Sequence, residues 1–369
     1  MYLILHTFSR RNSGDGLLVD LTLEALEDAG IAASDCAILA LDPESFDDPV
    51  TIHTAPGEPF GRLSPRLAQA GLELIIDTLS AGRAGKVGKL ARQANGMIAV
   101  GGGYLVADSA VRQSGVLFNH MVQLSTAARA AVPTVYLPQS IGPAHGPVGA
   151  MMRKRLAAVD RLYVRDDTTF SELSDLSNVR RAGDLAVMKL ARKTQNIRPE
   201  NPIGRPVLVA RALPRAGKYL ARLNQLAEGL ENPIWAVQAD VPGPRSDAAF
   251  YHRLGQGDDG SFSKILQDGT PGVVVSVRLH GAIAALLAGW PAIHLSYERK
   301  GWGAYEDLGI AEYVHDARNF DPNLVLRQVR QLSEDPAPFW DRIKAASDSL
   351  NAQYADMVAD LKARLTAPS

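Results

Sequence analysis

Cysteine is almost absent from this chain: Cys36 is the only one in 369 residues. A single thiol excludes an intrachain disulfide and a thiolate metal cluster, and it is typical of a protein from a reducing compartment. An excess of either charge is lacking too, because 39 basic residues face 40 acidic ones and leave a net charge of -1. Nucleic-acid-binding proteins usually carry a basic excess, so we expect no nucleic-acid partner.

Long hydrophobic runs are also missing. The longest nearly apolar stretch, Gly281 to Leu295, is too short to span a bilayer and contains Gly289 and Pro291. The apolar segment 1–8 has no arginine before it and no small-residue cleavage site after it, so we interpret it as a buried strand, not a signal peptide. These features predict a globular, cytoplasmic protein. No His-x-x-x-His or Cys/His cluster occurs, so we expect no metal site.

Short apolar runs alternate with helical patterns along the chain. Strand-like runs cover 3–6, 37–41, 96–100, 133–137, 161–164, 178–182, 207–210, 234–237, 273–277 and 292–295. Helical patterns cover 16–29, 65–93, 116–131, 220–230, 282–288, 322–332 and 339–365. Such alternation predicts an α/β fold with parallel sheets that are covered by helices on both faces.

One segment interrupts this alternation. Residues 193–206 contain three prolines, two asparagines and a glycine, which is typical of a linker. We therefore predict two Rossmann-like, doubly wound domains, residues 1–195 and 205–335, followed by a C-terminal helix in 336–369. In such sheets ligands bind at the carboxyl ends of the strands, so residues that follow strands are the candidates for a site.

In the first half, two glycine-containing segments follow strands. Asn12–Gly16, which includes Asp15, can leave N–H groups pointing into a cleft, or it can simply cap the next helix. Gly102 and Gly103, in the run Gly101–Gly103, let the backbone approach a ligand closely, although a tight turn without a ligand is the alternative. The run is not G-x-G-x-x-G, so it does not predict dinucleotide binding.

Polar side chains follow two other strands of the first half. Gln139 and Ser140 can hydrogen-bond a sugar or a carboxylate, and a polar turn before a helix is the alternative reading. Arg165 can clamp an anion, or it can form an ion pair with Asp166 or Asp167.

The segment Ser276–Lys300 is the most informative. Arg278 and His280 lie where an apolar strand passes into a helix, and the helix N-terminus adds positive potential there. Lys300 follows the next strand. This grouping is typical of a site that holds a small, strongly anionic substrate beside a proton donor. His294 lies within an apolar strand and is interpreted as a core residue.

Three more residues of the second half belong to the same predicted cleft. Arg211 follows a strand and is either a second anion clamp or a surface charge. Tyr297 and Glu298 precede Lys300 and can act as acid/base or positioning groups. For Glu298, an ion pair with Arg299 is the alternative.

These residues together resemble the polysaccharide pyruvyl transferases. The segments that carry the resemblance are Asn12–Asp15, Gly101–Gly103, Pro138–Gly142, Val164–Asp166, Ser276–Gly281, Gly289–Pro291, Ser296–Tyr297 and Lys300. Each segment alone is weakly specific, but their order and spacing together are fairly specific. Between Ala182 and Val273 little matches. Glu298 stands where the family leads us to expect an aspartate, so its role and the identity of the acceptor stay open.

The resemblance implies a GT-B-like fold whose last helix packs back on the first domain, with the first domain on the acceptor side and the second on the donor side. It also implies transfer of pyruvyl from phosphoenolpyruvate to two hydroxyls of a sugar in a surface polysaccharide, an exopolysaccharide or a precursor. The product is a cyclic pyruvate ketal, and phosphate is released. His280 is then the catalytic acid, and Arg165, Arg278 and Lys300 bind phosphoenolpyruvate. The candidates for the cleft or the acceptor are Asp15, Gly102, Gly103, Gln139, Ser140, Arg211, Tyr297 and Glu298.

This scheme needs no cofactor and no metal. Its partners are phosphoenolpyruvate and a sugar, for which a lipid-linked oligosaccharide with peripheral membrane association is one option. The main alternative is a GT-B glycosyltransferase that uses a nucleotide sugar, in which Asp240 or Glu298 would bind the ribose. A nucleotide-sugar epimerase and a non-catalytic carbohydrate-binding subunit are further alternatives.

Overall fold

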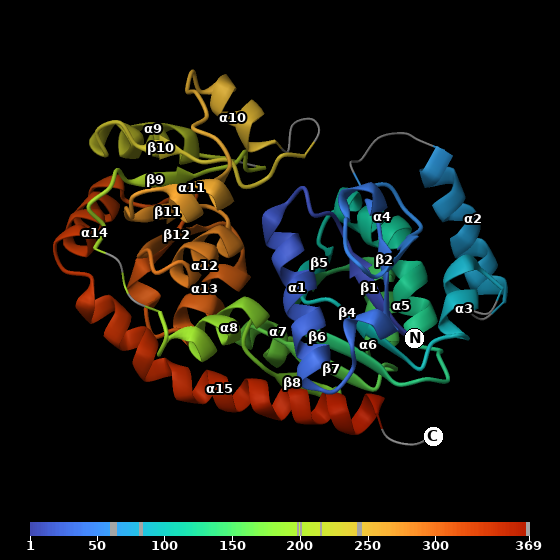
Figure 1. Ribbon diagram of the computed structural model, residues 1–369. Coiled ribbons are helices and arrows are strands. Elements are labelled where there is room, and N and C mark those ends of the chain that lie inside the picture. Colours follow the sequence, from blue (N-terminus) through green and yellow to red (C-terminus); the bar gives the residue numbers. More distant parts are fainter. Residues whose placement is uncertain are drawn as a thin grey trace. The chain divides into compact units, whose positions relative to one another are not determined.

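The computed structural model describes residues 1–59, 65–80, 84–197, 199, 201–214, 216–241 and 246–366, without the side chains of residues 299 and 300. The chain forms two compact units (Figure 1). Unit 1 contains residues 1–10, 15–185 and 353–369, and unit 2 contains residues 11–14 and 186–352. The boundary therefore lies at 185/186, whereas the proline-rich segment placed it near residue 195.

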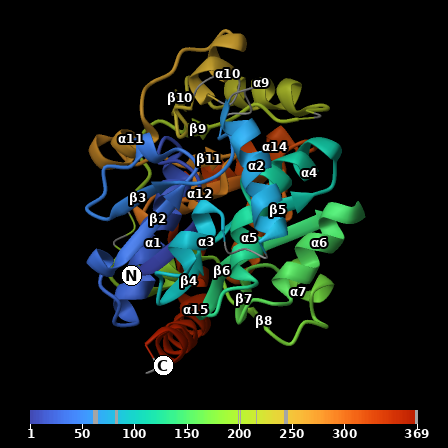
Figure 2. The same ribbon diagram turned by 90° about the vertical axis from the view of Figure 1, so that its right-hand side faces the viewer.

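Unit 1 is built on a parallel sheet, which in the described residues has the order β3-β2-β1-β4-β6-β7-β8, with β5 paired to β6. The strands are β1 (Tyr2–Thr7), β2 (Cys36–Ala40), β3 (Thr51–Thr54), β4 (Gly96–Ala99), β5 (Gly102–Ala107), β6 (Thr134–Ala144), β7 (Arg161–Val164) and β8 (Val179–Arg181). Strands β2 and β4 are apolar along their whole length because helices cover both faces of a parallel sheet. Figure 2 shows β5 running alongside β6.

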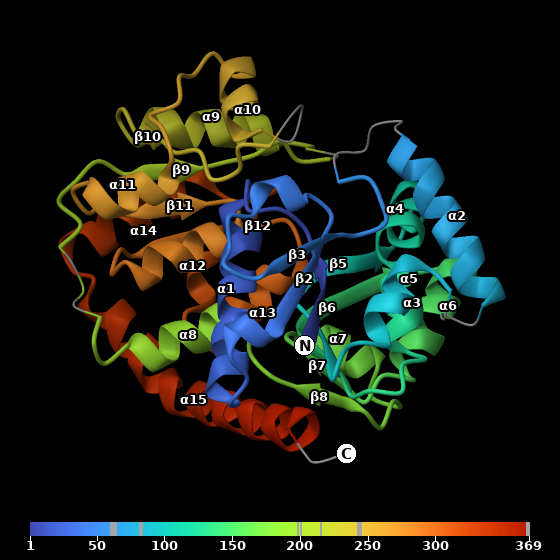
Figure 3. The same cartoon turned by 45° about the vertical axis from the view of Figure 1, so that its right-hand side comes forward.

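The helices of unit 1 divide between the two faces of this sheet. They are α1 (Ser13–Asp28), α2 (Pro65–Leu79), α3 (Lys86–Ala91), α4 (Ala110–Asn119), α5 (Met121–Ala127), α6 (Gly146–Leu156) and α7 (Asp167–Glu172). Helix α1 lies on one face, and α2 to α6 gather on the other (Figure 3). The connections that leave the neighbouring strands β1 and β4 therefore run in opposite directions, which makes β1/β4 the switch point of this sheet.

Unit 2 repeats this design with a smaller parallel sheet, of order β10-β9-β11-β12-β13 in the described residues. Its strands are β9 (Val207–Val209), β10 (Ile234–Trp235), β11 (Val274–Ser276), β12 (Ala292–Ser296) and β13 (Val314–Asp316). Its helices are α8 (Leu185–Lys193), α9 (Tyr219–Gly229), α10 (Asp247–Arg253), α11 (Phe262–Asp268), α12 (Leu279–Leu287), α13 (Arg299–Asp307) and α14 (Pro322–Glu334). Here β9 connects towards β10 on one side and β11 connects towards β12 on the other, so the switch point of this sheet is β9/β11.

The last helix, α15 (Ala337–Leu365), confirms the long C-terminal periodicity. Its apolar positions are buried at spacings of four and seven, for example Phe339, Ile343, Leu350 and Met357. Its last turns pack on unit 1, where Tyr354 donates a hydrogen bond to Asp28 at 2.5 Å. The predicted packing of this helix on the first domain is therefore confirmed.

Two strand ends differ from the sequence prediction. Strand β6 continues to Ala144, so Gln139 and Ser140 lie inside a buried strand and not in a polar turn. Likewise Gly102 and Gly103 open strand β5, so the glycine run is not an isolated loop. The reason is that β5 pairs with the extension of β6, and this pairing supplies the backbone hydrogen bonds that the predicted turns would have left unused.

Candidate functional site

Three predicted residues meet at one edge of the unit 2 sheet. Strands β9, β11 and β12 are parallel neighbours, so their carboxyl ends share an edge. Arg211 follows β9, Arg278 follows β11 and Tyr297 follows β12. Because β9/β11 is also the switch point, this edge is where a doubly wound sheet forms its ligand crevice.

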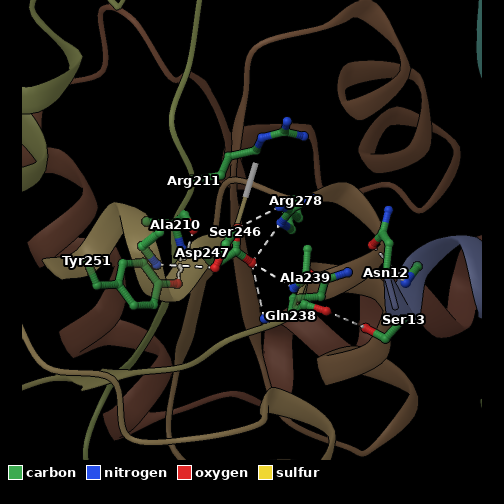
Figure 4. Close-up of polar contacts among 12 residues, drawn as sticks. Asn12, Ser13, Ala210, Arg211, Gln238, Ala239, Ser246, Asp247, Tyr251 and Arg278 are labelled. Carbon is green, nitrogen blue, oxygen red and sulfur yellow. Dashed lines mark hydrogen bonds and ion pairs between the residues drawn. The ribbon is translucent and has the colours of Figure 1, made fainter. Parts of the chain in front are cut away.

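Arg278 is held in place by a buried carboxylate that the sequence analysis did not identify. Its Nε and Nη2 donate to the two carboxylate oxygens of Asp247 at 3.0 and 2.6 Å (Figure 4). Arg278 is 8% exposed and Asp247 is fully buried. Burial alone would lower the arginine pKa, but the contact with Asp247 outweighs it and raises the pKa of Arg278. The guanidinium is therefore charged and fixed in direction.

Asp247 itself is fixed by the backbone. One of its oxygens also accepts hydrogen bonds from the N–H groups of Gln238 at 3.2 Å and Ala239 at 2.8 Å. It is the first residue of α10, where Ser246 caps the helix by accepting from the Ala249 N–H at 3.2 Å. A carboxylate in this first turn is favoured by the helix dipole. Asp247 therefore links the Gln238–Ala239 segment to Arg278.

Arg211 and Tyr297, from two different strands, contact each other. Arg211 Nη1 donates to the Tyr297 hydroxyl at 2.9 Å, and its guanidinium carbon lies 5.3 Å from the centre of the tyrosine ring. The Arg211 Nε is buried and has no hydrogen-bond partner among the described residues. This edge thus holds a second oriented arginine beside a phenol.

His280 lies in the first turn of α12, for which Arg278 is the N-cap residue. Residues 11–14 of the N-terminal segment belong to the same unit and pack against it. A methyl group added at Gly14 would lie 2.9 Å from His280 Cβ and 3.2 Å from its Nδ1. The backbone of Gly14 therefore borders the imidazole directly, and a larger residue there would displace it.

The segment around Gly14 is tied to the same loop that Asp247 holds. Asn12 and Ala239 form an isolated antiparallel bridge, and the Asp240 N–H donates to the Arg11 carbonyl at 3.1 Å. Ser13 Oγ donates to the Gln238 carbonyl at 3.3 Å (Figure 4). The predicted Asn12–Asp15 motif thus contributes its first residues to unit 2, whereas Asp15 belongs to unit 1, in the first turn of α1.

Gly281 offers a direct test of how tightly this site is packed. An alanine Cβ there would lie 2.2 Å from Gln238 Oε1 and 2.7 Å from Ser276 Oγ. We expect Gly281→Ala to destabilise the protein by ~1–3 kcal/mol in urea unfolding, because overpacking forces side chains off their rotamers. The control is Gly115→Ala in α4, where the added methyl meets nothing within 4 Å. That change should be neutral or stabilise by ~0.5–1 kcal/mol, and equal effects of the two variants would contradict the packing.

In unit 1, Arg165 forms a buried ion pair, but not with the predicted partners. Its Nη1 donates to Asp184 and its Nε donates to Ser140 Oγ at 3.1 Å. Asp166 instead caps α7. Arg165 is only 2% exposed, and its Nη2 is buried without a hydrogen-bond partner among the described residues. The structure thus brings Arg165 beside Ser140 and Gln139, which are neighbours in strand β6.

The remaining candidates are less constrained. Gly102 and Gly103 begin β5, and the neighbouring Gly101 packs so closely on Pro138 that a Cβ there would lie 2.8 Å from its carbonyl oxygen. Glu298 is partly buried and is the N-cap residue of α13. The side chain of Lys300 lies outside the described residues. Arg165 belongs to unit 1 and Arg278 and His280 to unit 2, so convergence of the cations stays a prediction.

His294, predicted to be a core residue, is 2% exposed, and its Nδ1 lies 2.8 Å from the Ser276 carbonyl oxygen. Within the described residues, no group of three or more His, Cys, Asp or Glu is placed to hold a metal ion. No helix in the described part of the chain combines the length and the apolar character needed to cross a membrane.

Sequence reasoning missed two acidic partners, Asp247 and Asp184. Asp184 could have been identified from the sequence, because it follows β8, the parallel neighbour of the strand that precedes Arg165. Asp247 carried no such signal, since it opens a helix that leads away from the β9/β11 edge and lies 31 residues from Arg278.

The fold defines the class. Two Rossmann-like sheets of parallel strands give a GT-B fold, and solved structures of that class are similar over nearly the whole chain. A candidate UDP-N-acetylglucosamine 2-epimerase from Listeria monocytogenes has a TM-score of 0.54 at 11% identity, with 100% of this chain and 97% of that one covered. The Methanocaldococcus jannaschii UDP-GlcNAc 2-epimerase, solved with UDP-GlcNAc and UDP, has a TM-score of 0.50 at 11% identity, with 91% of this chain and 93% of that one covered. Spinosyn forosaminyltransferase has a TM-score of 0.50 at 13% identity, with 99% of each chain covered.

Within this class, the chain belongs to the polysaccharide pyruvyl transferase family, whose pattern it matches over residues 12–254. The match ends before Arg278 and His280, so the strongest motif of the sequence lies outside it. No curated protein matches the chain. At 9–13% identity, the structural neighbours establish the fold alone.

Proposed function

We propose that the protein is a ketal pyruvyltransferase. It transfers the pyruvyl group of phosphoenolpyruvate to two hydroxyls of one sugar in a surface polysaccharide, an exopolysaccharide or a precursor, and releases phosphate. The observation that carries this proposal is the arrangement at the unit 2 edge. There Arg278, oriented by Asp247, lies two residues from His280 at a helix N-terminus. Membership of the polysaccharide pyruvyl transferase family supports the proposal.

The donor suits this edge because phosphoenolpyruvate carries about three negative charges at neutral pH. An arginine fork matches the planar carboxylate and the phosphate in a way that a point charge does not. We assign Arg278, together with Arg165 and Lys300, to donor binding. The further candidates for the cleft or the acceptor are Asp15, Gly102, Gly103, Gln139, Ser140, Arg211, Tyr297 and Glu298.

The chemistry begins with protonation of C3 of the enol by His280, which leaves positive charge at C2. One sugar hydroxyl attacks C2 and loses its proton, which restores the acid. The C2–oxygen bond to phosphate then breaks, and the second hydroxyl attacks C2 and closes the ring. Of the two hydroxyl protons, one is balanced by the new methyl hydrogen and the other leaves with phosphate. Neither a metal nor a cofactor enters these steps.

The partners are therefore phosphoenolpyruvate and a sugar, for which a lipid-linked oligosaccharide at the membrane surface is one form. We place the reaction in the cytoplasm, where phosphoenolpyruvate would be available. The fold also suits a nucleotide-sugar glycosyltransferase, which is the second candidate, because spinosyn forosaminyltransferase is among the structural neighbours.

The two candidates are separated by one assay on the unmodified protein. The probes are p-nitrophenyl pyranosides of galactose, glucose, mannose, N-acetylglucosamine and N-acetylmannosamine, each given with phosphoenolpyruvate or with UDP- and dTDP-sugars. We expect inorganic phosphate to be released from phosphoenolpyruvate only when a glycoside is present, and the product to gain the mass of a pyruvate ketal. Turnover of a nucleotide sugar without any use of phosphoenolpyruvate would support the second candidate instead.

A further inference from the structure

A buried group of aromatic rings in unit 1 takes no part in the scheme above. We call it the ring cluster, and it consists of His6, Tyr104, His120 and Tyr136. The Tyr104 ring stacks on His6 at 4.9 Å between centroids and on His120 at 4.8 Å. His6 and Tyr136 are 1% exposed, and His120 is 8% exposed. His6 and His120 show no ligand spacing along the chain, so only the fold brings them together.

The ring cluster lies at the switch point of the unit 1 sheet. His6 is near the carboxyl end of β1, and Tyr104 follows the neighbouring strand β4. The rule that places the ligand crevice of unit 2 at β9/β11 places that of unit 1 at β1/β4. The location therefore suggests a ligand before any side chain is considered.

The strained backbone at His6 also suggests a ligand site. Its φ is 63°, in the left-handed region, which costs a non-glycine residue ~1–2 kcal/mol. The conformation is fixed by a hydrogen bond from the His6 N–H to Gln123 Oε1 at 2.8 Å. Such strain is retained when a side chain must be held in one orientation, and it is found more often at functional sites than elsewhere.

Two hydrogen bonds connect the rings and restrict where their protons can lie. Tyr136 Oη lies 3.0 Å from His6 Nε2, and His6 Nδ1 lies 3.2 Å from His120 Nδ1. Burial lowers the pKa of both histidines, that of His120 to about 4, so both are neutral at pH 7. We infer that the Tyr136 hydroxyl donates to His6 Nε2, the hydrogen-bond partner that the described residues offer it, because a buried hydroxyl proton needs an acceptor. His6 then carries its proton on Nδ1 and donates to His120, and His120 carries its proton on Nε2.

Gln139 contacts the ring cluster through the Tyr104 hydroxyl and carries an unused acceptor. Gln139 Nε2 donates to the Tyr104 hydroxyl at 2.8 Å and to the Val100 carbonyl at 3.3 Å, which fixes the orientation of the amide. Gln139 Oε1 is buried and has no hydrogen-bond partner among the described residues, and the same is true of Thr7 Oγ1. Buried polar atoms without partners are rare in proteins, so these oxygens call for a ligand or a water.

From these contacts we propose that the ring cluster, with Gln139 and Thr7, is the binding site for the acceptor sugar. His120 Nε2–H donates to a sugar oxygen, and Gln139 Oε1 and Thr7 Oγ1 bind hydroxyls. The rings, Gln139 and Thr7 offer uncharged donors and acceptors, which suit a polyhydroxylated ring. Arg165, the cation that acts on Tyr104, is already paired with Asp184. His6 is a positioning residue, since it acts only through the proton that it fixes on His120. The proposal rests on the proposed function for the identity of the ligand.

The first measurement concerns binding and does not require turnover. Saturation-transfer NMR with the five p-nitrophenyl pyranosides compares the unmodified protein with His120→Ala and with Gln139→Leu. We expect both variants to bind at least one glycoside about tenfold more weakly, the effect of one lost hydrogen bond in a buried site. His252→Ala, an exposed histidine of α10, is the matched control and should bind normally. Equal binding by all the proteins, or no binding of any pyranoside, overturns the proposal.

The second measurement separates a ligand role from a structural one. In the phosphate-release assay, His120→Ala should raise the KM for the glycoside about tenfold and leave the KM for phosphoenolpyruvate within twofold. His120→Gln retains a donor and should recover much of the loss even if the alanine variant folds poorly. A lowered melting temperature with both KM values unchanged would show that an internal water fills the site. If no glycoside stimulates phosphate release but binding still depends on His120, the proposed function fails and the sugar site stands.

Nitrogen-15 NMR of histidine-labelled protein checks the assigned protons. At pH 7 we expect His6 to be the Nδ1–H tautomer and His120 the Nε2–H tautomer, with the resonances assigned from the His6→Gln and His120→Gln variants. A charged His120, or the opposite tautomer at either ring, would remove the donor on which the site depends.

Discussion

His280→Ala is expected to reduce pyruvyl transfer by ~10²–10⁴-fold, the usual contribution of a positioned acid. The enol ether of phosphoenolpyruvate does not react with a hydroxyl until C3 is protonated, and His280 is the titratable group that shares the start of α12 with Arg278. The KM for phosphoenolpyruvate should change little, because the arginines that we assign to the donor remain. His252→Ala, in α10 of the same unit, is the matched control and should retain full activity.

The origin of the proton gives this prediction a second readout. In deuterated water the unmodified protein should make a ketal whose methyl group carries one deuterium, which mass spectrometry detects. Near-normal rates for His280→Ala, with the same labelling, would assign protonation to another group. A product without deuterium at the methyl group would rule out protonation of C3 by any exchangeable acid.

Asp247→Ala is expected to have the largest effect on folding, a loss of ~3–5 kcal/mol, because it leaves Arg278 buried without a counter-charge. The same change removes the acceptor for the N–H groups of Gln238 and Ala239. Urea unfolding followed by circular dichroism measures the loss. The exposed Asp268→Ala, in α11, should change stability by less than ~0.5 kcal/mol.

A conservative variant separates folding from binding at this position. Asp247→Asn retains the shape and one acceptor oxygen, so it should be more stable than Asp247→Ala. It should still raise the KM for phosphoenolpyruvate, because Arg278 loses its bidentate partner and its fixed direction. A stability loss below ~1 kcal/mol for Asp247→Ala would mean that solvent reaches Arg278 more freely than its 8% exposure indicates.

The fold could be predicted from sequence because its signals are local. Apolar runs such as Gly96–Ala99 and the long period of α15 specify their elements without reference to distant residues. The predicted strands also put Arg211, Arg278 and Tyr297 directly after strand ends, where ligands bind in such sheets. The parallel order of the strands brings these residues to one edge. Where the sequence prediction was wrong, as at Gln139, pairing between β5 and β6 extended a strand through an apparent turn.

The partners of these residues could not be predicted, because they are set by packing between segments far apart in the chain. Asp247 and Arg278 are 31 residues apart, and His6 and His120 are 114 apart. No periodicity relates such pairs. His6 adds a left-handed backbone that sequence rules assign to glycine or asparagine. Both features are typical of functional sites, where local preference gives way to the geometry that a ligand requires.

The carboxylate beside Arg278 has a consequence for selectivity. Two of the guanidinium N–H groups are already occupied by Asp247, whose negative charge partly offsets that of the arginine. The other three N–H groups keep directions that the ion pair with Asp247 holds fixed. Such a group selects anions by the direction of their oxygens as well as by their charge, so carboxylate and phosphate oxygens that match the fork are preferred.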